Sequence, residues 1–127
     1  MQNKTNDLLG AVEYNSKRIY VNAEMPANER HFTLAHEIGH IFLHPQENQI
    51  DLRISNPEKS DKESEANVFA YELVMPLFRF IKAYKEFNGD TYSLSKCFFV
   101  PEKNVRKRIE FLQKQIDAKK IDNFINA

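Results

Sequence analysis

The feature that most constrains this chain is the stretch His36-Glu37-Ile38-Gly39-His40, which has the pattern H-E-x-x-H. In a helix, two histidines four positions apart lie one turn above the other on the same face, so both imidazoles can reach one metal ion. Glu37 lies beside them, where it can hold a water molecule bound to that ion. The spacing therefore predicts the core of a zinc hydrolase. Because these five residues can also occur by chance in an ordinary helix, the surrounding sequence has to decide between the two interpretations.

The residues around this motif predict a helix over residues 28–44, the motif helix. Its apolar side chains repeat at helical spacing. They are Phe32, Leu34, Ala35, Ile38, Gly39, Ile41 and Phe42. Pro45 ends the pattern. Glycine inside a helix costs roughly 1 kcal/mol relative to alanine, so we expect another element to approach the backbone closely at Gly39.

The residues before the motif predict a β-hairpin. Val12 and Tyr14 alternate with a polar residue, Asn15-Ser16 forms the turn, and residues 19–21 supply the return strand. Residues 50–54 fit either a short strand or an ordered loop. We therefore expect an α+β fold. In this fold a small antiparallel sheet, the N-terminal hairpin plus a possible extra strand, packs on the motif helix, and a mostly helical C-terminal half follows.

The second half of the chain has helical patterns throughout. Ser60 and Glu63 form a capping-box pattern, which opens a second helix that Pro76 ends. Its expected buried face consists of Ala66, Phe69, Ala70 and Leu73. Further helices are expected over residues 77–87 and 93–98, and a longer one begins at Pro101.

The length of 127 residues suits one domain with a single core. We expect one metallopeptidase domain over residues 1–127. It consists of a loose lead at 1–7, a zinc-site core at 8–75 and a helical tail at 77–127 that packs on the core.

A catalytic zinc site normally takes three protein ligands and leaves one position for water. His44 lies a further helical turn beyond His40, too far along the axis to share the ion, so we assign it to the helix end or the cleft wall. A carboxylate from the second helix is the better third ligand. Glu65 is the best candidate because it opens the buried face next to the small Ala66, whereas Glu63 is expected to face largely away and to cap the helix.

Three further residues of the second helix are weaker candidates. Glu72 could support a ligand histidine, although an ordinary half-buried glutamate is the favoured interpretation. Tyr71, like His44, could line the cleft or donate a hydrogen bond to a developing oxyanion. Asn67 is a candidate for a structural hydrogen bond. The expected chemistry is that one Zn²⁺ ion acidifies a bound water and that Glu37 acts as general base and then general acid.

Composition limits the location and the partners. Lysine plus arginine and aspartate plus glutamate each number 18, and this balance argues against a general nucleic-acid binder. The single cysteine, Cys97, permits no disulfide within the chain, and we expect it to be a small core residue. The first nine residues lack the apolar segment of a signal peptide, so we expect a cytoplasmic protein without a membrane partner. A basic run over residues 103–108 is expected to be a solvated face rather than a DNA-binding surface.

Two stretches in this order, residues 32–44 and 65–76, resemble the ImmA/IrrE family of zinc metallopeptidases, and the resemblance covers roughly residues 8–115. It implies a gluzincin-like core with zinc ligands at His36, His40 and Glu65 and with Glu37 as the catalytic base. It also implies a protein substrate, a helix-turn-helix repressor whose cleavage releases genes of a mobile element, a prophage or a stress response. The alternatives are a non-catalytic regulator and a toxin-system partner that binds a repressor or DNA.

Overall fold

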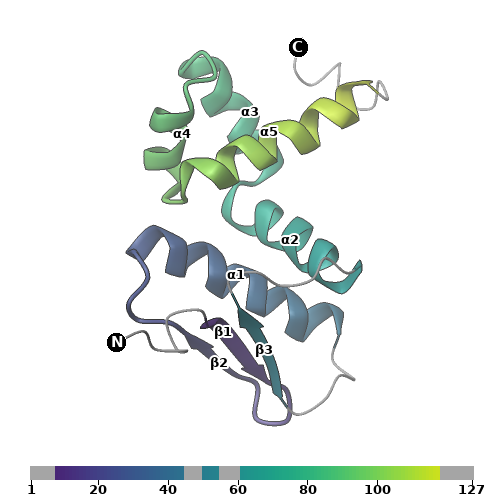
Figure 1. The fold of residues 1–127 in the computed structure, drawn as a ribbon. Helices are drawn as coiled ribbons and strands as arrows, with labels where there is room; N and C mark the ends of the chain where they lie inside the picture. The colour runs from purple at the N-terminus through teal and green to yellow at the C-terminus, as the bar shows by residue number, and fades with distance from the viewer. Residues whose placement is uncertain (1–7, 45–49, 55–60, 118–127) are drawn as a thin grey trace. The chain divides into compact units, whose positions relative to one another are not determined.

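The computed structural model describes residues 8–44, 50–54 and 61–117 (Figure 1). The expected loose lead at 1–7, the helix stop at Pro45 and the cap at Ser60 lie outside these residues. The elements, in chain order, are β1 (Leu8–Glu13), β2 (Arg18–Val21), α1 (Ala27–Leu43), β3 (Ile50–Ile54), α2 (Asp61–Val74), α3 (Leu77–Glu86), α4 (Thr91–Phe98) and α5 (Glu102–Asp117). The chain divides into two compact units, Met1–Leu73 and Val74–Ala127. The expected single metallopeptidase domain stays a prediction.

The first unit contains an antiparallel sheet with the strand order β2-β1-β3. The central residue Ala11 pairs with Tyr20 on one side and with Leu52 on the other. The turn between β1 and β2 is tight, and Lys17 adopts a positive φ of 58° there. The predicted hairpin is therefore confirmed, and residues 50–54 are a strand rather than a loop. With the helices that follow, this sheet confirms the α+β fold.

Helix α1 lies between the sheet and α2 within the first unit (Figure 1). This position explains why polar side chains are buried along it as well as apolar ones. They are Thr33, His36, Glu37 and His40. The predicted apolar row is right for Phe32, Ala35 and Gly39, which are buried. It is wrong for Phe42, which is 69% exposed and stacks on the ring of Phe69 with the centroids 5.8 Å apart.

Helix α2 crosses α1 at Gly39, which confirms the expectation that another element approaches the backbone closely there. A Cβ added there would lie 3.1 Å from Cβ of Phe69 and 3.2 Å from the backbone oxygen of Ala66. Ala66 and Ala70 have no exposed surface, which confirms this part of the predicted buried face. Leu73 was wrongly included, because half of its surface is exposed. The close crossing brings the first turn of α2 to the motif helix.

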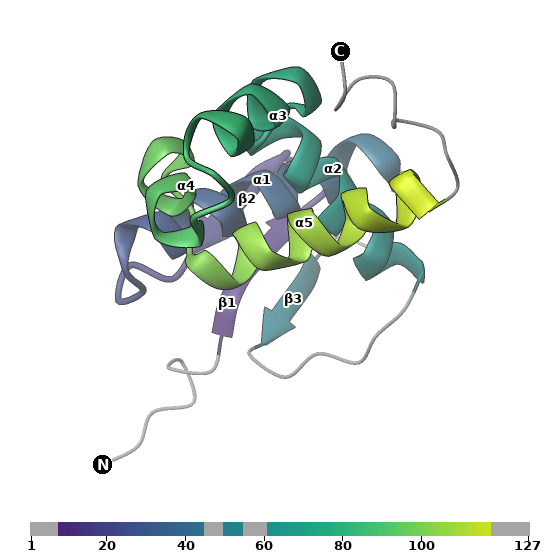
Figure 2. The ribbon, with the colours of Figure 1, turned by 90° about the horizontal axis from the view of Figure 1, so that it is seen from above.

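The second unit contains α3, α4 and α5, and α4 lies beside the first turns of α5 (Figures 1 and 2). Asp90 caps α4 because its carboxylate accepts a hydrogen bond from the backbone amide of Ser93 at 2.9 Å. Asn88 and Gly89 have positive φ angles of 54° and 75°, which form the predicted end of α3. Cys97 is exposed, so its expected core position was wrong.

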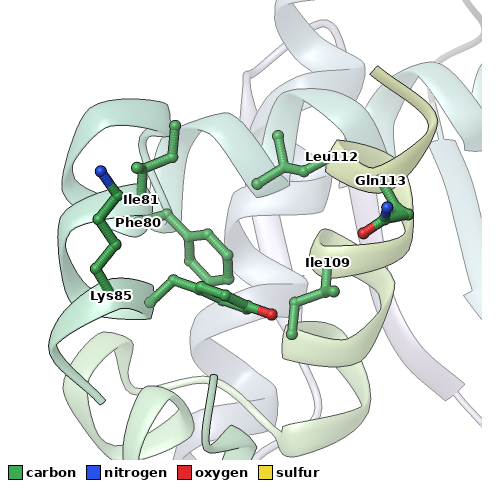
Figure 3. A pocket seen from close by; sticks show the side chains of 7 residues that line it. Phe80, Ile81, Lys85, Ile109, Leu112 and Gln113 are labelled. Atoms are coloured by element: carbon green, nitrogen blue, oxygen red, sulfur yellow. The ribbon is translucent and has the colours of Figure 1, made fainter. Parts of the chain in front are cut away.

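Arg108 is the largest fully buried side chain of the described residues, although the basic run was expected to be solvated. Its guanidinium donates a 2.9 Å hydrogen bond to the backbone oxygen of Met75 and lies 5.8 Å from the ring centroid of Phe80. These contacts offset the free-energy cost of burying the positive charge of Arg108. Helices α3 and α5 also border an apolar cavity of about 190 Å³ (Figure 3). In the part of the chain that the structure describes, no helix has the length and apolar character needed to cross a membrane.

Candidate metal centre

Three side chains from two helices converge at one point in the first unit. The Nε2 atoms of His36 and His40, both on α1, lie 3.2 Å apart. The carboxylate of Glu63, in the first turn of α2, lies 2.8 Å from the His36 nitrogen and 3.1 Å from the His40 nitrogen. Both histidines are buried and Glu63 is half-buried. The arrangement presents three potential ligand atoms to a single ion.

The carboxylate that lies beside the two histidines belongs to Glu63 and not, as we expected, to Glu65. Glu65 is mostly exposed, and its Oε1 lies 3.5 Å from Nε2 of His44. Residues two apart on a helix point about 200° away from each other, so only one of the two glutamates can face α1. Glu63 precedes the buried Ala66 and Ala70 by three and seven positions, which places it on their face. The sequence therefore indicates that Glu63 shares a face with the small residues, and the tertiary structure shows that this face meets α1.

Asn67, one turn after Glu63, supports one of the histidines. Its Oδ1 lies 2.8 Å from Nδ1 of His36. An amide oxygen accepts hydrogen bonds, so this contact favours a proton on Nδ1 of His36, and in the neutral ring the Nε2 lone pair then faces the cluster. Such an outer partner fixes the ring orientation and the tautomer that a metal ligand needs. The expected structural hydrogen bond at Asn67 is thus confirmed.

The electrostatics of the cluster favour a bound cation. Partial burial raises the pKa of the Glu63 carboxyl, but hydrogen bonds and charge interactions with His36 and His40 outweigh burial and hold this pKa well below its usual range. The carboxylate accepts these hydrogen bonds from imidazole N–H groups, and a metal ion would take the place of the protons between the same donor atoms. Around a tetrahedral zinc ion with bonds of about 2.05 Å, the ligand atoms lie about 3.3 Å apart. The observed separations of 2.8 to 3.2 Å are close to this value, so the residues fit such an ion.

Glu37 follows His36 on α1, and its side chain reaches strand β1 of the sheet. It is only 1% exposed, and a Cβ added to Gly10 of β1 would lie 2.9 Å from its Oε2. Only a glycine leaves room for the carboxylate at this point of the strand. Gly10 was not among the residues expected at the site, although a glycine inside a strand indicates that another group approaches the backbone closely.

The remaining candidates lie at different places. The ring of His44 is 5.5 Å from that of His40, next to the cluster. Tyr71 is buried and packs on the ring of Phe32 with the centroids 5.4 Å apart. Glu72 is exposed on α2. A supporting or cleft-wall role for these residues stays a prediction.

Comparison with known proteins places the motif in a wider context. The family model of a peptidase family, the IrrE N-terminal-like domain, matches residues 1–110. The chain is also similar to the uncharacterized immunity region protein 2 of Bacillus phage phi105, with 36% identity over 77 residues. This alignment covers 58% of the chain, and the chain spans about half, 49%, of the length of that relative. The comparison with solved structures gave no match.

Proposed function

Because the chain belongs to the peptidase family of the IrrE N-terminal-like domain, to which its ImmA/IrrE-like motifs pointed, we propose that it is a zinc-dependent endopeptidase. The observation that carries the proposal is the cluster of His36, His40 and Glu63, with Glu37 buried on the same helix. Two imidazoles and one carboxylate are a donor set typical of zinc peptidases. A zinc ion bound there would supply a Lewis acid that lowers the pKa of a bound water.

The residues of the chain divide the remaining work. Glu37 takes a proton from the attacking water and returns it to the leaving amine, as general base and then general acid. Asn67 holds His36 in the tautomer that presents Nε2 to the ion. Strand β2 lies at one edge of the sheet, where its free backbone groups can pair with an extended peptide. This pairing would hold the substrate backbone alongside the motif helix.

The substrate class that we propose is a helix-turn-helix transcriptional repressor, and the protein would act in the cytoplasm. The immunity-region name of the phage relative supports a setting in which a repressor controls other genes. Since the chain spans about half of that relative, the substrate is proposed for the chain and not transferred from it.

The test uses the purified protein with helix-turn-helix repressors of the same organism as candidate substrates. Cleavage is followed by mass spectrometry and bound zinc by elemental analysis. We expect the wild type to bind one zinc and to cut the substrate at a defined bond. Glu37→Gln should keep the zinc and lose cleavage, because it removes the base and leaves the ligands in place. Cleavage that survives this change would refute the role of Glu37.

A matched pair of variants tests the ligand assignment. Glu63→Gln should lose most of the bound zinc, whereas Glu65→Gln, the same change two residues later, should retain it. If Glu63→Gln keeps its zinc and Glu65→Gln loses it, then Glu65 and not Glu63 is the ligand. A wild-type protein that binds the repressor or promoter DNA tightly without cutting the repressor would instead favour a non-catalytic regulator.

A further inference from the structure

A groove lies on the surface of the first unit, between the end of α1 and the first half of α2. It has a volume of about 530 Å³ and is open to solvent. The residues that line it are Leu43, Ser64, Glu65, Val68 and Phe69. The volume is large enough for an amino-acid side chain with the backbone on either side of it. All five residues belong to the same compact unit as the candidate metal centre.

The wall of the groove is apolar although it is exposed. Leu43 and Val68 retain 44% and 37% of their surfaces, and the neighbouring Phe42 is more exposed still. Phe42 stacks on Phe69, so the apolar surface continues beyond the groove. Adjoining apolar side chains that remain open to water are typical of a surface that binds another molecule.

The groove lies near the candidate metal centre. Leu43, which lines the groove, follows His40 by three residues on α1. The ring of His44 connects the two places, since it lies 5.5 Å from the ring of His40 and its Nε2 lies 3.5 Å from Oε1 of Glu65. A peptide positioned at the metal centre would therefore pass close to the groove.

The groove also has a charge that limits what can bind there. Glu65 is 59% exposed, so its carboxylate can meet a charged group of a ligand. An apolar wall beside an accessible carboxylate complements an apolar side chain next to a basic one. We propose that the groove binds an apolar side chain of the substrate protein and that Glu65 pairs with an adjacent lysine or arginine. The groove then determines which bond is presented to the metal centre. This inference rests on the proposed peptidase function. It specifies which residues of the substrate the site would recognise, namely an apolar residue next to a basic one.

The test measures binding separately from cleavage. The zinc-loaded Glu37→Gln protein is applied to an array of immobilised decapeptides in which two adjacent positions carry every pair of residue types. We expect it to retain peptides with leucine, isoleucine or phenylalanine next to lysine or arginine. Val68→Asp in the same background should lower the affinity for these peptides at least tenfold, because it places a charge in the apolar wall. Val68→Leu, which keeps the apolar wall, should bind like the parent.

A charge reversal gives an independent result. Glu65→Lys should change the preferred neighbour of the apolar residue from basic to acidic, whereas Glu24→Lys, an exposed reversal in the loop before α1, should not. The same peptide preference in Val68→Asp, Glu65→Lys and the parent would overturn the inference, as would an array that retains no peptide. Zinc content and melting temperature of each variant show that it is folded. If the array gives the expected pattern but the wild type cuts no substrate, the groove assignment stands and the peptidase proposal fails.

Discussion

Replacing Gly10 by alanine should reduce catalysis while leaving the metal centre intact. The added Cβ would lie 2.9 Å from Oε2 of Glu37, whereas an ordinary carbon–oxygen contact begins at about 3.4 Å. The carboxylate must therefore move by about 0.5 Å. It is the mobile end of a flexible side chain, so it moves before the strand does. The backbone of Gly10 also has no positive φ angle that alanine would strain.

The magnitude follows from the sensitivity of proton transfer to position. A displacement of about 1 Å in a catalytic group can cost roughly a hundredfold in rate. A displacement of half that size should lower kcat about tenfold, which corresponds to about 1.4 kcal/mol of transition-state stabilisation. Alanine in a strand is more favourable than glycine by roughly 0.5–1 kcal/mol, which offsets the crowding, so the melting temperature should change little.

The assay compares kcat, KM, bound zinc and melting temperature of Gly10→Ala with those of the wild type. The added Cβ would also lie 3.1 Å from Cγ2 of Thr33, so the double variant Gly10→Ala/Thr33→Ser serves as control. Its kcat should stay low, because it relieves the contact with Thr33 and not the one with Glu37. An unchanged kcat in Gly10→Ala would refute the argument that this glycine makes room for the base. Loss of zinc would refute the separation of the base from the ligands.

Three further substitutions probe contacts on which the site and the second unit depend. Asn67→Leu removes the hydrogen bond to His36 and should weaken zinc binding about 10- to 100-fold in a chelator competition; unchanged affinity would contradict its orienting role. Arg108→Met leaves the buried backbone oxygen of Met75 without this donor and should lower the free energy of unfolding in urea by about 1–3 kcal/mol, so an equally stable variant would count against the contact. Asp90→Ala should lower the melting temperature at neutral pH. Hydrogen bonds from the hydroxyl and then the backbone amide of the residue three positions on hold the pKa of Asp90 below its usual range. Its stabilising effect is therefore complete above the pKa of the unfolded chain and is lost as the pH falls through the lowered value. The melting temperatures of wild type and variant should begin to converge as the pH falls below about 4. A difference that stays unchanged down to pH 2 would show that the charge is not responsible.

Most of the secondary structure follows from local patterns in the sequence. The motif helix was expected over residues 28–44 and is Ala27–Leu43, because its helical repeat of apolar residues ends before a proline. The possible strand at 50–54 is Ile50–Ile54. The histidine spacing by itself also places both imidazoles on one face, since four residues make about one turn. The glycine in the motif helix correctly predicted the close crossing of a second helix.

The tertiary structure alone decided which groups meet. Whether Glu63 or Glu65 reaches the histidines depends on the rotation of α2 about its own axis, and packing of Ala66 and Phe69 against Gly39 of α1 sets that rotation. The approach of Glu37 to Gly10 likewise joins residues far apart in the chain. Periodicity along a sequence determines which face of an element is apolar or polar. The angle and depth at which two faces meet depend on the side chains of both elements at once, and so the motif alone did not identify the carboxylate that lies beside the two histidines.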